Sequence, residues 1–328
     1  MKKLYVLITI IILSLLSNYS FSNNNAIVRY AFAIGANNGG AKREVLRYAV
    51  TDARSFIHVL TRMGGVKKNK SKILVNPNKK LILHSFNKLA KKIQTHKNES
   101  KRVELFFYYS GHADEEGILL KKDKISYKKI RDMIKSIDAD VKIAILDSCS
   151  SGGFTRIKGG KVHKPFIVDT SFNMKGYAFM TSSSINEASQ ESDRIKGSFF
   201  THYLVTGLRG AADATKDGRV TLNEAYQYAY QETLGGTEKT ISGPQHPNYF
   251  IKMSGTGDVV VTDIRRSSSS LILDKNLSGR LSIRDKNNSL IVELQKIKGR
   301  KIQLGMDKGS YSIIKTDSSG KLKVAQVT

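Results

Sequence analysis

Two hydrophobic patterns alternate along the first two thirds of the chain. Mostly apolar runs of strand length occupy residues 26–34, 72–75, 103–109, 143–146 and 176–180. Between them, apolar residues recur at helical spacing in residues 46–63, 80–96, 127–137 and 198–208. Runs with so few polar positions are typical of strands buried on both faces. The alternation of strands and helices predicts an α/β fold, a mostly parallel sheet flanked by helices with right-handed crossovers.

The pattern changes after Gly255. A polar linker at residues 265–270 precedes short alternating strands with glycine turns at residues 271–273, 279–283, 290–294, 301–304, 311–316 and 322–327. Regularly spaced short strands are typical of a small all-β sandwich. We therefore expect an α/β domain over residues 26–262 and a linker with a small β-rich accessory domain over residues 263–328. The second domain shows no catalytic constellation, so packing, binding or display is its default role.

The first 22 residues have the pattern of a secretory signal peptide. Lys2 and Lys3 precede an apolar run at residues 4–16, and Ser20-Phe21-Ser22 follows with small residues at the spacing of a cleavage site. The run is short for a transmembrane span, although an uncleaved anchor is an alternative. We predict that residues 1–22 are removed, that the protein is secreted or periplasmic, and that it then has no stable membrane span.

The charge of the chain is strongly positive, at +26 over 328 residues. Loss of Lys2 and Lys3 with the signal would leave +24, since 26 − 2 = 24. Such a charge favours attraction to anionic surfaces. The lysines are nevertheless scattered as pairs, and no helix-turn-helix, RNA-binding or zinc-finger pattern is present. We therefore interpret the lysines as solvated surface residues and predict no nucleic-acid partner.

Cys149 is the only cysteine in the chain. It follows the apolar run 143–146 within Asp147-Ser148-Cys149-Ser150-Ser151, which leads into two glycines. A single thiol forms no internal disulfide and belongs to no metal-binding cysteine cluster. It is therefore either a small buried hydrophobe or a nucleophile. The loop-forming neighbours favour the nucleophile.

A histidine occupies the matching place on another strand. Residues 103–109 run into Ser110-Gly111-His112. Because sites form at the carboxyl ends of parallel strands, we expect His112 and Cys149 to lie together on neighbouring strands. His112 would then act as general base for the thiol, and the backbone N–H groups of Cys149 and Ala113 would stabilise an oxyanion. The other histidines lack this strand-end context: His58, His84, His96, His163, His202 and His246.

One segment matches the template of a calcium-binding loop. Asp213, Asp217, Gly218, Val220 and Glu224 fit its positions 1, 5, 6, 8 and 12, with Thr215 at position 3 and Arg219 at position 7. The alternative is structural, since Thr221-x-x-Glu224 is also a capping box that would begin a helix over residues 222–234. Calcium is thus a possible ligand, and no cofactor is required by the predicted chemistry.

The two strand-end motifs resemble those of the caspase clan, in particular bacterial relatives of metacaspases and paracaspases. The resemblance rests on Tyr-Tyr-Ser110-Gly111-His112-Ala113, on Asp147-Ser148-Cys149-Ser150-Ser151-Gly152, and on the segment 46–53. It covers about residues 27–260 and implies the caspase–haemoglobinase fold and Cys/His peptide hydrolysis. Ala113 stands where the family usually has Gly and Ser150 where it often has His. Because Ala adopts fewer backbone angles, the oxyanion geometry is affected first.

The resemblance also implies a specificity. Metacaspase-like enzymes line the pocket for the residue before the cut with acids, and these positions fall on Asp52 and Asp147, with Ser110 beside them. Two carboxylates in one slot favour a guanidinium or ammonium group, so the expected substrates are proteins or peptides cut after Arg or Lys. The structural alternatives are that Asp52 is an exposed helix residue and that Asp147 orients the loop through backbone hydrogen bonds.

The polar, basic segment 155–173 lies where this family often cuts itself. Self-cleavage there would follow Arg156, Lys158, Lys161 or Lys164. Two other functions remain open from the sequence. One is an envelope-binding protein on an inactive caspase-like scaffold, and the other is a thiol hydrolase that acts on a non-peptide amide.

Overall fold

The computed structural model describes residues 27–40, 43–99, 101–149, 175–184, 187–316 and 322–328. The predicted signal peptide and the predicted self-cleavage segment lie outside these ranges. No helix in the described part of the chain combines the length and the hydropathy that a membrane crossing requires.

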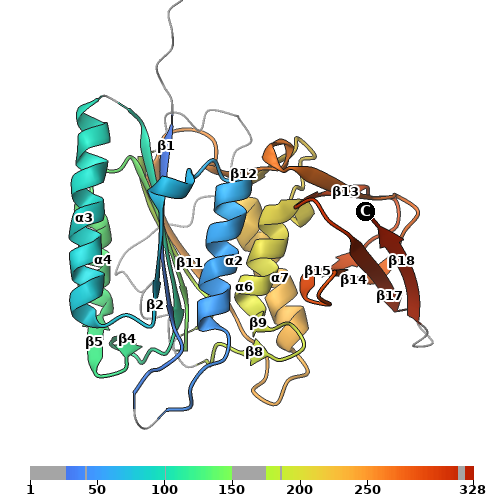
Figure 1. Ribbon diagram of the computed structural model, residues 1–328, viewed down its shortest axis with the longest axis horizontal. Helices are drawn as coiled ribbons and strands as arrows, with labels where there is room; N and C mark the ends of the chain where they lie inside the picture. The colour runs from blue at the N-terminus through green and yellow to red at the C-terminus, as the bar shows by residue number, and fades with distance from the viewer. Residues whose placement is uncertain (1–26, 41–42, 100, 150–174, 185–186, 317–321) are drawn as a thin grey trace, which may run out of the picture.

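A six-stranded sheet forms the centre of the molecule (Figure 1). Its strands are β1 (Val28–Ala36), β2 (Ser71–Val75), β3 (Val103–Gly111), β6 (Val141–Asp147), β7 (Lys175–Thr181) and β11 (Asn248–Ser254). Their order is β11-β7-β6-β3-β1-β2. The first five in the chain pair in parallel, whereas β11 is antiparallel to β7. The mostly parallel sheet is confirmed, and β11 is an edge strand that the hydrophobic pattern did not predict.

Helices cover both faces of this sheet (Figure 1). One face packs against α3 (Lys79–Asn98) and α4 (Tyr127–Ser136). The other packs against α2 (Ala49–Arg62), α6 (Phe199–Thr206) and α7 (Leu222–Thr237). The side chains of β6 alternate between the two cores: Ile143 and Ile145 belong to the second, Ala144 and Leu146 to the first. This burial on two sides explains why the strand sequences are mostly apolar and lack a regular alternation of apolar and polar residues.

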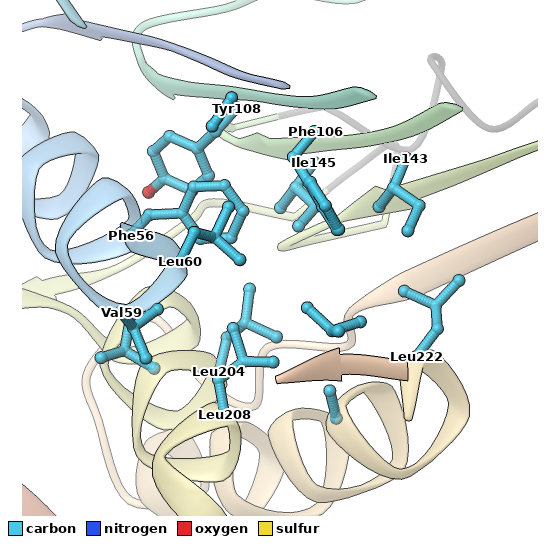
Figure 2. Close-up of a cluster of buried hydrophobic side chains, with 14 of the residues drawn as sticks. Phe56, Val59, Leu60, Phe106, Tyr108, Ile143, Ile145, Leu204, Leu208 and Leu222 are labelled. Carbon is cyan, nitrogen blue, oxygen red and sulfur yellow. The ribbon is translucent and has the colours of Figure 1, made fainter. Parts of the chain in front are cut away.

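Aromatic packing fixes α2 over the sheet (Figure 2). The rings of Phe56 and Tyr108 stack with centroids 4.7 Å apart, and both side chains are almost completely buried. Asp52 lies one turn before Phe56 and therefore on the same helix face. The packing that buries Phe56 thus directs the carboxylate of Asp52 toward the carboxyl end of β3.

The remaining elements of the α/β unit are short. They are η1 (Lys68–Lys70), β4 (Gly117–Leu120), β5 (Asp123–Ser126), β8 (Glu191–Ser192), β9 (Gly197–Ser198), the π-type turn η3 (Gly207–Ala211), β10 (Arg219–Thr221), β12 (Val260–Asp263) and η4 (Ile264–Arg266). The β4–β5 hairpin and the β8–β9 hairpin were not predicted. The helix expected from residue 46 begins only at Ala49, because the N–H of Leu46 bonds to the carbonyl of Asn37 at 2.9 Å in a preceding loop.

The C-terminal strands form two antiparallel sheets that share one core. They are β13 (Ser269–Leu273), β14 (Gly279–Asp285), β15 (Leu290–Lys296), β16 (Ile302–Met306), β17 (Tyr311–Thr316) and β18 (Leu322–Val327). One sheet is β13-β16 and the other is β15-β14-β17-β18. Apolar side chains of both sheets pack in one cluster with Ala211 of the α/β unit. The expected domain boundary at 262/263 falls inside β12, and the expected linker already includes the first residues of β13.

The C-terminal sheets are packed tightly on the α/β unit. Gly210 has a φ of +122°, and a Cβ there would lie 2.3 Å from the carbonyl oxygen of Gln303. The buried guanidinium of Arg209 donates to the carbonyl of Gly305 at 3.1 Å. Such close backbone approach requires glycine. The β unit, residues 269–328, is therefore joined to α6 and η3 by close contacts as well as by the chain.

Candidate active site

The pairing of β3 with β6 places His112 and Cys149 at one edge of the sheet. Ser110 of β3 pairs with Asp147 of β6, an offset of 147 − 110 = 37 residues. His112 and Cys149 have the same offset, 149 − 112 = 37. Each therefore lies two residues beyond the last pair that joins β3 to β6. Both residues thus follow the carboxyl ends of neighbouring strands, and their action as a pair stays a prediction.

The imidazole of His112 is oriented by a main-chain carbonyl. Its Nε2 lies 2.7 Å from the carbonyl oxygen of Glu44, in the loop before α2. Because a carbonyl only accepts hydrogen bonds, Nε2 carries the proton in the neutral ring. Nδ1 is then the nitrogen with a free lone pair. Glu44 thus orients His112 through its main-chain carbonyl. The sequence does not predict this role, because no pattern of residue types indicates it.

The backbone at His112 is held equally firmly. Its carbonyl accepts from the hydroxyl of Tyr109 at 2.6 Å and from the N–H of Leu119 at 2.8 Å. The neighbouring Ala113 forms an isolated antiparallel bridge with Ile118. The unpredicted β4–β5 hairpin therefore fixes the main chain that leaves β3, including the predicted oxyanion donor at Ala113.

Gly39 lies directly against the imidazole ring. A Cβ at this position would be 2.5 Å from each of Cβ, Cγ and Cδ2 of His112. Real Cβ atoms do not approach other atoms this closely, so any side chain at residue 39 would displace the ring or the loop. The glycine is required by the position of His112 rather than by a special φ angle.

The thiol of Cys149 is half-buried. It donates a weak hydrogen bond to the carbonyl of Ser189, with a sulfur–oxygen distance of 3.8 Å. Burial raises the pKa of the Cys149 thiol, and the negative charge of Asp147 raises it further. The sulfur is therefore protonated at neutral pH. The sulfur is thus partly exposed and contacts a polar loop carbonyl, whereas a structural cysteine is typically fully buried among aliphatic groups.

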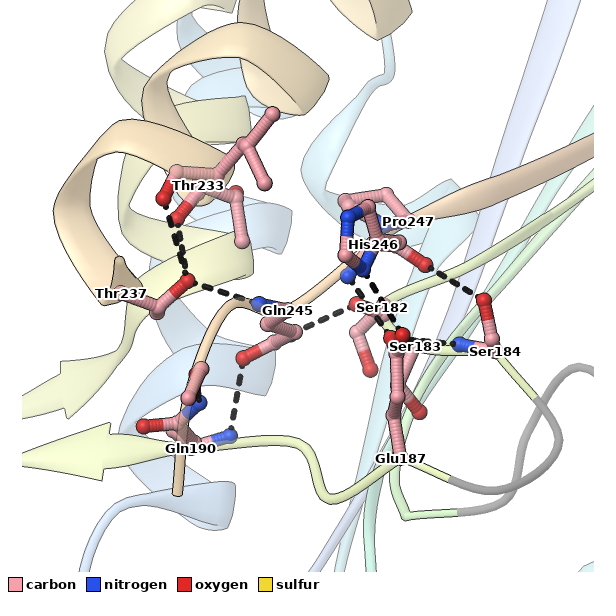
Figure 3. Close-up of polar contacts among 12 residues, drawn as sticks. Ser182, Ser183, Ser184, Glu187, Gln190, Thr233, Thr237, Gln245, His246 and Pro247 are labelled. Atoms are coloured by element: carbon pink, nitrogen blue, oxygen red, sulfur yellow. Dashed lines mark hydrogen bonds and ion pairs between the residues drawn. The ribbon is translucent and has the colours of Figure 1, made fainter. Parts of the chain in front are cut away.

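Serine hydroxyls anchor the loop that carries Cys149. The N–H of Ser148 donates to the hydroxyl of Ser182 at 3.0 Å, and the hydroxyl of Ser183 donates to the carbonyl of Ser148 at 3.1 Å. Ser182 is supported in turn by the buried side-chain amide of Gln245, which donates to its carbonyl at 2.6 Å (Figure 3). These bonds tie the end of β6 to the end of β7.

Asp52, Ser110 and Asp147 lie together beneath this edge. All three are buried, with 4%, 4% and 3% of their surface exposed. The hydroxyl of Ser110 lies 3.5 Å from Oδ2 of Asp52. The alternative that Asp52 is an exposed helix residue is therefore wrong, because Asp52 shares the inward face of α2 with Phe56.

Asp147 is bound by hydroxyl groups rather than by backbone N–H groups. Its Oδ1 accepts from Ser189 at 2.5 Å, and its Oδ2 accepts from Thr201 at 2.5 Å and from the hydroxyl of Ser198. The N–H of Ser198 lies 3.3 Å from both carboxylate oxygens of Asp52. Ser198 therefore connects the two acids, and it also caps α6.

The two carboxylates affect each other's ionisation. Burial raises the pKa of Asp52 well above its usual range, and the nearby charge of Asp147 raises it further. Two buried acids close to each other are unfavourable as a doubly ionised pair. Within the described residues, no cationic side chain is among the recorded hydrogen-bond or ion-pair partners of either acid, so the pair favours a state in which Asp52 is protonated.

The acidic segment that follows β7 is folded back onto the site. The carboxylate of Glu191 accepts from the N–H groups of Arg47 and Tyr48 at 3.0 and 3.3 Å, at the amino end of α2. Glu187 pairs with His246 at 2.7 Å (Figure 3). Because β11 is antiparallel, Asn248 pairs with Thr181, so His246 lies at the same sheet edge as His112. The expectation that His246 lacks a strand-end position was wrong.

The predicted calcium loop has its carboxylates turned to its own backbone. Glu224 accepts from the N–H groups of Ala214 and Thr215, and Asp213 accepts from those of Lys216 and Gly218. The capping box between Thr221 and Glu224 is present. Within the described ranges, no group of three or more His, Cys, Asp or Glu side chains is arranged to hold a metal ion, and neither the predicted ligand Asp217 nor Arg219 belongs to such a group.

Comparison with known proteins assigns the α/β unit. A family model described as "Caspase domain" matches residues 28–254. The chain belongs to the caspase-domain family. No curated protein matches this chain. Among solved structures, caspase-1 from Spodoptera frugiperda is similar over 72% of this chain and 90% of its own, with 13% sequence identity and a TM-score of 0.49. The family match confirms the resemblance to caspases and the caspase-like fold predicted from the sequence. The domain gives the chain the scaffold of a cysteine peptidase.

The raised pKa of Asp52 in this caspase domain predicts a pH-dependent stability. A carboxyl group whose pKa is raised on folding stabilises the protein fully below its unfolded pKa, near 3.8, and this contribution is lost as the pH rises through the folded pKa. The free energy of unfolding of wild type minus that of Asp52→Asn should therefore fall as the pH rises from about 4, by up to ~1.4 kcal/mol per pH unit.

Urea denaturation of both proteins between pH 4 and pH 8 measures this difference. Asp132→Asn is a suitable control, because Asp132 is exposed on α4 and its hydrogen bond with Lys128 lowers its pKa. The control difference should stay nearly constant over this range, because the contribution of a lowered pKa is already present above the unfolded pKa, near 3.8, and is lost only at lower pH. A difference between wild type and Asp52→Asn that is constant over this range would contradict the prediction.

Proposed function

We propose that the protein is a cysteine endopeptidase in which Cys149 is the nucleophile and His112 the general base. The observation that carries the proposal is the shared 37-residue offset, which brings both residues to one end of paired strands. The bond from His112 Nε2 to the Glu44 carbonyl supports the assignment, because it leaves Nδ1 able to accept a proton.

The proposed reaction uses only groups of the protein and water. His112 Nδ1 accepts the thiol proton as the sulfur of Cys149 forms a bond to the peptide carbonyl carbon. The N–H groups of Cys149 and Ala113 stabilise the resulting oxyanion. Collapse breaks the C–N bond, and His112 gives the proton to the leaving amine. Water, deprotonated by His112, then hydrolyses the thioester and releases the acid.

The raised pKa of Cys149 determines when the proton is transferred in this reaction. Because the resting sulfur is a neutral thiol, the proton must move to His112 when substrate is bound rather than beforehand. The reaction therefore depends on the position of the imidazole, which Gly39 and Glu44 determine.

Cleavage after Arg or Lys is the specificity that the buried acids support. Asp52 and Asp147 lie beside Ser110 with no cationic side chain among their recorded partners in the described residues. A guanidinium or ammonium group would offset the negative charge and so favour ionisation of both carboxylates. An acidic side chain would bring a further negative charge to the same place and be repelled.

A peptide digest tests this function. Peptides that differ only in Arg, Lys, Asp or Leu before the cut are incubated with wild type, Cys149→Ala and His112→Ala, each with and without a calcium chelator. We expect cleavage after Arg and Lys by wild type in both buffers, and a loss of at least about 10³-fold in both variants. Cleavage after Asp would contradict the specificity. No cleavage of any peptide would favour an inactive binding scaffold, and hydrolysis of non-peptide amides alone would favour a different thiol hydrolase.

A substitution at Gly39 separates the position of His112 from its chemistry. Gly39→Ala should lower kcat by roughly 10²-fold, because a displacement of about 1 Å in a catalytic group has an effect of this size. The fold should be retained, since residue 39 lies in a loop outside both cores. Circular dichroism and peptide kinetics measure the two effects. Gly235→Ala, in α7 with no atom within 4 Å of the added Cβ, is the control. Full activity of Gly39→Ala would contradict the proposed role of His112.

Self-cleavage follows from the same specificity. We propose that the exported enzyme, freed of residues 1–22, cuts within residues 155–173 after Arg156, Lys158, Lys161 or Lys164. Intact mass after incubation should show two fragments for wild type and a single chain for Cys149→Ala. Identical masses for the two proteins would exclude self-cleavage and leave the cleavage of other substrates untouched.

A further inference from the structure

The β8–β9 hairpin, residues 191–198, forms one wall of the candidate site. Its Ser198 bonds to both Asp52 and Asp147, and its Glu191 binds the amino end of α2. Two residues before it, the hydroxyl of Ser189 donates to Asp147 and the carbonyl of Ser189 accepts from the thiol of Cys149. Any displacement of this hairpin would therefore be transmitted to both acids.

The hairpin is too small to hold this position alone. β8 and β9 contribute two residue pairs, Glu191 with Ser198 and Ser192 with Gly197. A two-stranded hairpin is at best marginally stable in water. Its turn also contains Lys196 with a φ of +56°, an unfavourable conformation for a residue with a side chain. Contacts from elsewhere must determine where it lies.

Those contacts come from the C-terminal β unit. At the tip of the hairpin, the guanidinium of Arg194 forms a two-point ion pair with Glu293 of β15, with Nη1–Oε1 at 2.5 Å and Nη2–Oε2 at 3.0 Å. The next residue, Ile195, is buried in a cluster with Leu290 at the start of β15. The tip is thus held by one ionic and one apolar contact to the same strand.

Glu293 is built to receive this arginine. It is 4% exposed, and it also accepts from Arg280 at 3.1 Å and from the hydroxyls of Tyr203 and Ser282 at 3.4 Å each. Burial by itself would raise the pKa of Glu293, but the hydrogen bond with Arg194 and the charges of Arg280 and Arg194 lower it to about 2. The acid is therefore ionised under all ordinary conditions.

We propose that the C-terminal β unit is part of the active site, because Glu293 acts through Arg194 to hold the β8–β9 hairpin against Asp52 and Asp147. Arg194 and Glu293 are positioning residues on this view, since neither touches the reacting atoms. The β unit is then required for substrate binding and is more than an accessory module. The proposal rests on the peptidase function in its kinetic part only.

The full-length variant Arg194→Met tests this role. It removes the charge at the hairpin tip, while Glu293 keeps Arg280 as its partner and Arg280 keeps Glu232 at 2.8 Å. We expect amide hydrogen exchange across residues 191–198 to be roughly tenfold faster or more than in wild type, because the lost ion pair is bidentate and partly buried. Exchange in α7 and β14 should be unchanged. Arg194→Lys should restore part of the protection.

Kinetics provide the second readout. For a peptide cleaved after Arg, KM should rise about tenfold in Arg194→Met and kcat should change less than about threefold, because Cys149 and His112 are placed by β6 and β3. Asp307→Asn is the matched control. It removes ion pairs between the same β unit and His58 and Arg62 at the far end of α2, so it should leave the hairpin exchange and KM at wild-type values.

The outcomes separate this proposal from the proposed function. Unchanged exchange over residues 191–198 in a folded Arg194→Met protein would overturn the role of Arg194 whatever the kinetics. Equal effects of Asp307→Asn and Arg194→Met on the hairpin would also overturn it, because they would indicate general loosening of the β unit. If no peptide is cleaved by wild type, the peptidase function fails while the exchange experiment still decides the positioning role.

Discussion

The parallel pairing of β3 with β6 is the constraint on which the rest of the site depends. Both strands are buried on two faces, so their register is set by apolar side chains that fit the cores formed with α2 and α3. A slip of one residue would reverse which side chains face each core. The same register carries His112 and Cys149 to the same height beyond the sheet. The position of the proposed catalytic groups is therefore a consequence of hydrophobic packing.

The polar part of the site is built differently, from hydroxyl groups that satisfy buried acids. Ser189, Ser198 and Thr201 donate to Asp147, whereas the N–H of Ser198 and the hydroxyl of Ser110 lie farther from Asp52, at 3.3 and 3.5 Å. Burying two carboxylates near each other is unfavourable. Stability would be better served by a neutral residue at position 52. Under the proposed specificity, a cationic side chain of the substrate would offset this cost when it binds.

Much of this arrangement could be predicted from the sequence. The strand-end positions of His112 and Cys149 followed from two apolar runs that end in small residues, because such runs have few alternative structures. The Glu44 carbonyl could not be predicted, since every residue has one. β11 was missed because its residues are mostly half-buried or exposed and alternate weakly, and the location of His246 was lost with it. The ion pair of Arg194 with Glu293 joins residues 99 apart that share no motif.

The protonated state of Cys149 has a consequence for the lifetime of the protein. Peroxide and disulfides react with thiolates far faster than with neutral thiols. A sulfur whose pKa is raised by burial is consequently slow to oxidise while no substrate is bound. An unpaired thiol could then persist in surroundings that would convert an exposed, acidic cysteine into a sulfinate, and it would become vulnerable only during turnover.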